Sequence, residues 1–170
     1  MLKRAIDITL SSIGILVLSP LLPLISLLIK LDSKGSVFYT CNRIGKDEKP
    51  FGMLKLRTMY TTPSALGPSV CPEGDPRVTP IGRILRRTKI NEFPQLFNVL
   101  TGDMALVGPR PEAPDLAALY PEHAKPIFSV KPGLVGPNQI LGRNEEEWYP
   151  RDVDPQQYYI ESAMRNCRSS

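Results

Sequence analysis

Residues 8–29, ITLSSIGILVLSPLLPLISLLI, carry no charged side chain. Lys3, Arg4 and Asp7 precede this stretch, and Lys30 follows it directly. As a straight helix the stretch would be roughly 33 Å long, at about 1.5 Å per residue, which is about the thickness of the hydrocarbon core of a bilayer. The sequence therefore predicts a membrane-associated helix at this end of the chain.

The middle of this stretch contains Ser19 and Pro20, and Pro23 lies one turn later. An interior proline removes a backbone hydrogen bond and kinks a helix, and a serine hydroxyl can bond to a freed carbonyl. Because positive residues flank both ends, we expect a bent helix that enters the membrane and returns to the cytoplasmic side, with its kink at Ser19 and Pro20. A straight spanning helix, a signal peptide and a buried helical hairpin of a soluble core remain alternatives.

Composition limits the class of protein. The chain has 170 residues, a formal net charge of +4 and 18 prolines, which fits one modest domain and excludes collagen, coiled coils and wholly disordered chains. So mild a charge argues against a nucleic-acid partner. The three cysteines, Cys41, Cys71 and Cys167, fit neither a disulfide framework nor a zinc site, which indicates a reducing compartment.

Two helices are expected in the middle of the chain. Between Thr79 and Thr88, apolar and basic residues alternate with helical spacing, with Ile81, Ile84 and Leu85 on one face and Arg83, Arg86 and Arg87 on another. A second helix is expected to begin with Asn91 as its N-cap and to end at Gly102.

The remaining segments predict short elements. Residues 36–59 read as a β-hairpin around the polar turn KDEKP, and residues 60–76 as a loop rich in proline and glycine. MALVGPRPE is expected to be a rigid turn, residues 113–130 a short helix and an extended piece, and residues 131–143 a loop with a brief strand. The tail from residue 144 is polar and ends without an apolar element, so we expect a truncated C-terminus.

Several cations could converge on phosphate. They are Lys55, Arg57, Arg77, Arg86, Arg110 and Arg143, in a chain that also places Glu92 at the start of the second helix. A helix start surrounded by guanidinium groups suits a diphosphate, although any single arginine could equally be a solvated surface charge. Pro109 and Pro111 fix the backbone around Arg110, which indicates an aimed side chain. His123 reads as a surface residue.

The string DPRVTPIGRILRRTKINEFPQLFNVLTGDMALVGPRPE, with MLKLRTM before it and KPGLVGPNQILGR after it, closely resembles the bacterial sugar transferases, the small monotopic phosphoglycosyl transferases that use polyprenol phosphate. The resemblance implies an α+β fold. A re-entrant membrane helix (1–32) would precede a small, mostly helical cytosolic domain (33–170) with a short β-hairpin and amphipathic helices on the membrane surface.

The resemblance also implies an activity. Members transfer a phosphosugar from a nucleoside-diphosphate sugar, usually a UDP-sugar, to polyprenol phosphate at the cytosolic face of the bacterial inner membrane. They require Mg²⁺, release UMP and start the assembly of polysaccharides, lipopolysaccharide among them. The implied partners are the two substrates and membrane lipids, without nucleic acid, and homo-oligomerisation stays open.

The same resemblance assigns residues by position. Asn91 and Glu92 fall on the catalytic Asp-Glu dyad, with Glu92 also the metal ligand. Lys55, Arg86 and Arg110 fall among the phosphate-binding cations, and Arg143 near the nucleotide. Arg57, from the set of cations above, is a further candidate for substrate or phosphate binding. The nucleophile position is thus Asn91, and a neutral amide cannot replace an attacking carboxylate.

Four accounts of this substitution are open. Glu92 attacks instead, the acceptor displaces the nucleotide directly, the substitution traps the substrate complex, or the chain binds without catalysis. We therefore carry two function hypotheses, an active phosphoglycosyl transferase and a non-catalytic paralogue that binds nucleotide-sugar or polyprenol phosphate.

Overall fold

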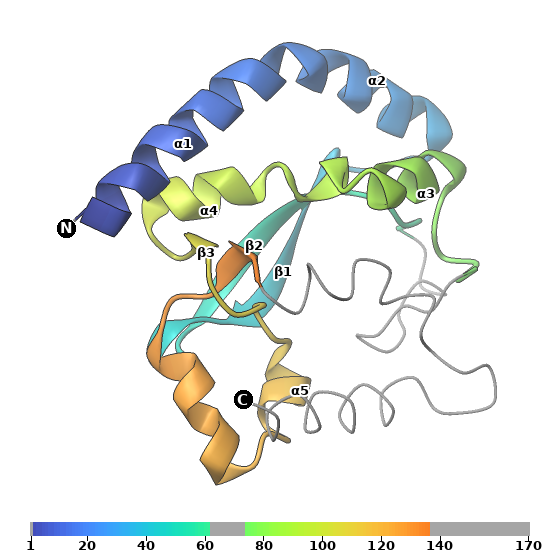
Figure 1. Cartoon of the computed structure of the whole chain (residues 1–170). Coiled ribbons are helices and arrows are strands. Elements are labelled where there is room, and N and C mark those ends of the chain that lie inside the picture. The colour runs from blue at the N-terminus through green and yellow to red at the C-terminus, as the bar shows by residue number, and fades with distance from the viewer. Residues whose placement is uncertain (1, 62–73, 137–170) are drawn as a thin grey trace.

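The computed structural model describes residues 2–61 and 74–136, which form a mixed α/β structure with one long N-terminal helical segment (Figure 1). The helical elements are α1 (Leu2–Leu18), η1 (Ser19–Leu21), α2 (Leu22–Asp32), η2 (Lys46–Glu48), α3 (Pro80–Arg87), η4 (Ile90–Glu92), α4 (Gln95–Thr101), α5 (Pro114–Ala117) and η5 (Glu122–Ser129). The strands are β1 (Phe38–Ile44), β2 (Pro50–Leu56), β3 (Ala105–Val107) and β4 (Gly133–Val135).

The N-terminal segment bends at the predicted place. α1 and α2 are separated by the tight turn η1, which begins at Ser19 and contains Pro20. The Ser19 hydroxyl donates to the Leu16 carbonyl over 3.1 Å, as the sequence predicts. Together α1, η1 and α2 are long and apolar enough to cross a membrane, and they form an arch over α3 and α4 (Figure 1).

Most apolar side chains of the arch face outward. Side chains that are more than half exposed extend from one end of the arch to the other, namely Leu2, Leu10, Ile13, Leu16, Val17, Leu24, Leu27 and Leu31. This exposure excludes the alternative of a helical hairpin buried in a soluble core, and it fits a segment that contacts lipid.

Both ends of the arch bind to the globular domain. Near the N-terminus, the Arg4 guanidinium donates to the Val99 and Leu100 carbonyls at the end of α4, and the Asp7 carboxylate accepts from the Leu106 amide. At the other end, the Asp32 carboxylate accepts from the Ile81 amide. Both ends of the arch are therefore attached to the same globular domain.

The predicted hairpin is confirmed. β1 and β2 pair antiparallel, with Tyr39 opposite Lys55 and Arg43 opposite Phe51, and η2 forms the polar turn between them. The Asn98 side chain of α4 binds the free edge of β2. Its Oδ1 accepts from the Leu54 amide and its Nδ2 donates to the Gly52 carbonyl, each over 2.9 Å.

The helix expected from Thr79 to Thr88 is confirmed as α3, whose first turn is capped by the Thr79 hydroxyl through the Gly82 amide. Leu85 joins Ile29 and Leu56 in one core cluster. Gly82 lies against the Thr58 backbone, where a Cβ atom would be 2.1 Å from the Thr58 carbonyl oxygen. Ile84, which the spacing places on the same face as Ile81 and Leu85, is exposed. The buried residues of α3 are therefore only Gly82 and Leu85, a narrow stripe of its surface.

Two further segments differ from expectation. Residues 105–107, expected to be part of a rigid turn, form β3, which pairs parallel to the predicted brief strand, β4. Parallel pairing joins segments far apart in sequence, which local patterns do not reveal. Within residues 113–130 the short helix is confirmed as α5, but the expected extended piece is the 3-10 helix η5. The predicted loop and C-terminal tail lie largely outside the described residues.

Candidate functional site

Two elements bring a cation and a carboxylate together beneath the arch. Lys55 lies near the end of β2, and Glu92 ends η4. The Lys55 Nζ and the Glu92 Oε1 are 3.8 Å apart, and both side chains remain about one-fifth exposed. The chain reaches η4 through Lys89, which adopts a left-handed conformation with φ of 60°, so that η4 turns back over β2. The pair is therefore accessible but held by two separate elements.

Burial lowers the pKa of Lys55 below its ordinary value, because the surrounding protein disfavours the charged ammonium. The neighbouring Glu92 carboxylate raises the pKa, and the positive charges of Arg110 and, more weakly, Arg43 lower it again. Lys55 thus lies in a cluster of cations. An anion that bound there would favour its protonated form.

Asn91 is buried beside this pair, with 7% of its surface exposed. The prediction that it caps a helix is wrong. η4 is preceded by Lys89, α4 is preceded by Pro94, and neither helix has a side-chain cap. The Asn91 Oδ1 is buried and has no hydrogen-bond partner among the described residues. An orphaned buried acceptor costs stability, so it calls for a functional reason.

The segment around Arg110 is fixed by backbone hydrogen bonds on both sides. The Gly133 amide donates to the Pro109 carbonyl over 2.7 Å, and the Ile44 amide donates to the Glu112 carbonyl over 2.8 Å. The backbone on both sides of Arg110 is therefore held in place, and the charge of Arg110 acts on Lys55. That its side chain is aimed at a phosphate stays a prediction.

Arg86 lies in the last turn of α3 and is half-buried. Its Nε donates to the Thr58 hydroxyl over 3.0 Å. Its predicted role in phosphate binding stays a prediction.

Arg57 has a different position from the other predicted cations. It is 5% exposed, and its guanidinium donates to the carbonyls of Ile29, Ser33 and Lys34 at the C-terminal end of α2. A cation is stabilised there by the helix dipole. The structure therefore assigns its guanidinium to the anchor and does not bring it to the Lys55–Glu92 pair.

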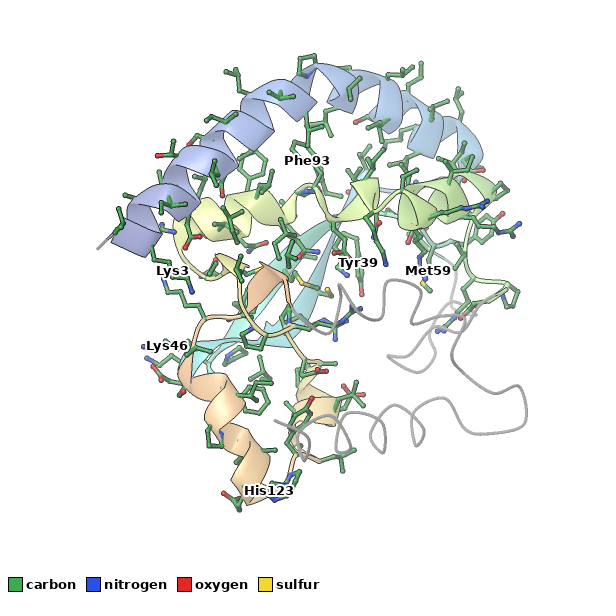
Figure 2. All side chains as sticks on the ribbon, in the orientation of Figure 1. Lys3, Tyr39, Lys46, Met59, Phe93 and His123 are labelled. Atoms are coloured by element: carbon green, nitrogen blue, oxygen red, sulfur yellow. The ribbon has the colours of Figure 1, made fainter. Side chains whose placement is uncertain are left out.

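The other predicted residues that the structure describes lie away from the Lys55–Glu92 pair. Arg77 forms a bidentate pair with Asp75. Ser19 and Pro20 lie at the bend of the arch, and His123 is exposed on η5, far from the arch, as expected (Figure 2). Arg143 lies outside the described residues.

Sequence reasoning missed two polar residues, Asn98 and Arg43. Asn98 looks like an ordinary helical residue, and its contact with β2 depends on tertiary packing. Arg43 did give a signal, because it alternates with Tyr39 and Cys41 along a predicted strand, and such residues share one face.

The residues present fit a magnesium ion held jointly with a substrate. Mg²⁺ in phosphate-transfer sites takes one or two protein oxygens and completes its shell with water and phosphate oxygens. Glu92 offers a carboxylate, and the unpartnered Asn91 Oδ1 offers an amide oxygen. Within the described ranges, no group of three or more potential ligands forms an all-protein metal site. A metal here would therefore depend on substrate phosphate.

The comparison with known families decides the assignment. The family model described as bacterial sugar transferase matches residues 1–166. The chain belongs to this family. The resemblance seen in the sequence is thereby confirmed.

Individual relatives carry more specific names. The chain is 46% identical over 151 residues to an undecaprenyl-phosphate glucose phosphotransferase of Komagataeibacter xylinus, which covers 85% of this chain and 28% of the relative. It is 41% identical over 145 residues to the UDP-glucose:undecaprenyl-phosphate glucose-1-phosphate transferase of Escherichia coli, covering 84% and 31%.

A third relative is close to this chain in extent. The exopolysaccharide production protein ExoY of Rhizobium meliloti is 38% identical over 173 residues, covering 93% of this chain and 76% of the relative. This sugar transferase thus spans less than a third of the first two relatives and most of the third.

Proposed function

We propose that this sugar transferase moves a sugar phosphate from a UDP-sugar to undecaprenyl phosphate, releasing UMP, and so begins the assembly of a bacterial surface polysaccharide. The observation that carries the proposal is the accessible Lys55–Glu92 pair with the constrained Arg110 beside it, beneath a helix of membrane length. A diphosphate needs such cations, and a polyprenol acceptor needs a site near the bilayer. The names of the relatives support both substrates.

We also propose that the arch is re-entrant. Arg4 and Asp7 bind one end of it to the globular domain, and Asp32 and Arg57 bind the other end to the same domain. A polar domain cannot lie on both sides of a bilayer, so a helix held in this way enters and leaves on one face. That face is the cytosolic one, where nucleotide-sugars are found.

Glu92 supplies the working carboxylate in this proposal. Asn91 is buried and neutral, whereas Glu92 is partly exposed and adjacent to the Lys55 ammonium. A Glu92 oxygen attacks the sugar-bearing phosphorus, the bond to the α-phosphate oxygen breaks, and UMP leaves with that electron pair. A phosphate oxygen of undecaprenyl phosphate then attacks the same phosphorus, which frees the carboxylate and forms the diphosphate-linked lipid.

The cations would stabilise the charge that develops on the phosphoryl oxygens during both displacements. Lys55 is released from Glu92 to a phosphoryl oxygen as the carboxylate attacks, so the ion pair holds both groups ready. Mg²⁺, held by Glu92 and the Asn91 amide oxygen together with the substrate, would supply further neutralisation of the diphosphate.

The test is UMP release by detergent-solubilised protein with Mg²⁺, undecaprenyl phosphate, and either UDP-glucose or UDP-N-acetylgalactosamine. We expect release with one donor, and a loss of at least 100-fold in Glu92→Gln. Donor labelled in the β-phosphate, without acceptor, should label the wild-type protein in a hydroxylamine-sensitive bond. UMP release without protein labelling would instead indicate direct displacement by the acceptor.

A second candidate function, binding without turnover, is favoured by Asn91 alone. It predicts tight binding of a UDP-sugar, no UMP release by the wild type, and a gain of turnover in Asn91→Asp. The same Asn91→Asp variant should change the rate only modestly if Glu92 is the working nucleophile.

A further inference from the structure

Arg43 lies on the face of the hairpin that carries Lys55, and no partner for it is found among the described residues. Residues opposite one another in an antiparallel pair project to the same face, and alternate residues of each strand share it. Tyr39, Cys41 and Arg43 therefore lie on one face with their partners Lys55, Met53 and Phe51. Met53 is buried in the core between them, so the two cations flank that core.

Arg43 as a whole residue is partly buried, and its Nε is fully buried. This Nε has no hydrogen-bond acceptor among residues 2–61 and 74–136. A desolvated guanidinium nitrogen without an acceptor is unfavourable. The Arg57 Nε is likewise buried without an acceptor, but its two terminal nitrogens donate to three backbone carbonyls. Among the described residues, no such acceptor is found for the guanidinium of Arg43.

The neighbourhood of Arg43 is positive. The hydrogen bond from the Ile44 amide to the Glu112 carbonyl holds the Arg110 segment against the end of β1, next to Arg43. The charges of both arginines act on Lys55. Three cations thus surround a site in which Glu92 is the carboxylate paired with Lys55. Clustered like charges are costly unless an anion joins them.

We propose that Arg43 is a further substrate-binding residue, which donates a hydrogen bond to a phosphoryl oxygen of the nucleoside diphosphate. The phosphoryl oxygen would thereby supply the acceptor that the guanidinium lacks among the described residues. This inference rests on the proposed function for the identity of the ligand. A diphosphate carries oxygens on two adjacent phosphorus atoms, so it can contact Lys55 and an arginine at the same time.

The test measures binding, which needs no turnover. Titration calorimetry with UDP-glucose and with UDP-N-acetylgalactosamine compares the wild type with Arg43→Gln and Arg43→Lys. Lys46→Gln is the matched control, because it removes one positive charge from the exposed tip of the same hairpin, at the opposite end from Tyr39 (Figure 2). We expect affinity to fall at least tenfold in Arg43→Gln, less in Arg43→Lys, and less than twofold in Lys46→Gln.

Equal affinities in Arg43→Gln and Lys46→Gln would overturn the proposal. If neither UDP-sugar binds the wild type, the proposed donor is wrong, and the same comparison with inorganic diphosphate then decides the role of Arg43 independently. Should Arg43→Gln fail to fold, phenylglyoxal labelling of the wild type replaces it. Diphosphate is expected to protect Arg43 and leave the exposed Arg83 reactive, and equal labelling of Arg43 with and without diphosphate would refute the inference.

Discussion

The cations at the junction between the arch and the globular domain have different hydrogen-bond partners from the cations of the candidate site. At the junction, Arg4 and Arg57 each bind carbonyls at the C-terminal end of a helix. At the site, Lys55 pairs with the Glu92 carboxylate over 3.8 Å, and the guanidinium of Arg43 has no acceptor among the described residues. The terminal nitrogens of Arg4 and Arg57 are thus engaged by backbone carbonyls and tie the arch to the domain, whereas the cations of the site are left for a ligand.

The largest expected effect concerns the two ends of the arch, which should be accessible from the same face of the membrane. Lys3 and Lys30 are both exposed and flank the arch. In sealed inside-out vesicles, in which the cytosolic face is outward, an impermeant amine reagent should modify both lysines. In right-side-out vesicles it should modify neither. Labelling of one lysine in each orientation would show a spanning helix and refute the re-entrant arrangement.

A large effect on stability is expected from Arg57→Gln. The substitution leaves several carbonyls at the end of α2 without their donor, in a buried place. We expect a loss of about 3 kcal/mol, seen in detergent as a fall of about 10 °C in Tm. Arg83→Gln, which removes an exposed arginine of α3, is the control and should change stability by less than about 0.5 kcal/mol. Similar Tm values for the two variants would mean that Arg57 is not a structural tie.

A smaller effect is expected from pH at the site. The pKa of Lys55 is lowered by burial and by the charges of Arg110 and Arg43, against the raising influence of Glu92 and Cys41. A bound diphosphate favours the ammonium and raises this pKa. Binding above the lowered pKa therefore takes up a proton, so affinity for a UDP-sugar should fall by up to about tenfold per pH unit as pH rises through it. Calorimetry from pH 7 to pH 10 measures this fall.

Lys55→Arg provides the control for that experiment, because arginine keeps its charge over the whole range. Its affinity should follow only the titration of the nucleotide itself. An identical pH profile in the wild type and in Lys55→Arg would contradict a role for Lys55 ionisation in binding.

The elements set by local patterns could be predicted from the sequence. The bend at Ser19 and Pro20, the hairpin around its polar turn, and the helix capped by Thr79 all depend on neighbouring residues. The sequence places Lys55 among cations beside the helix start that carries Glu92, and in the structure the two side chains form an ion pair.

What failed depends on distant contacts. Lys55 and Arg57 both belong to the set of cations that could converge on phosphate. β2 ends at Leu56, however, and Arg57 bonds instead to the end of α2. Asn91 has the right chemistry for a helix cap, but the left-handed Lys89 places it inside a tight turn. Neither outcome can be read from residues nearby in sequence.

The Asn98 carboxamide has a consequence for how the folded chain avoids pairing with other copies of itself. An amide side chain offers the same donor and acceptor as a peptide group, and Asn98 presents both to Gly52 and Leu54. For that stretch, β2 is paired as if a third strand were present. An open strand edge invites pairing with other chains, and a hairpin of two strands is marginal on its own. One helical side chain thus closes the place at which this small sheet could otherwise recruit a second copy of itself.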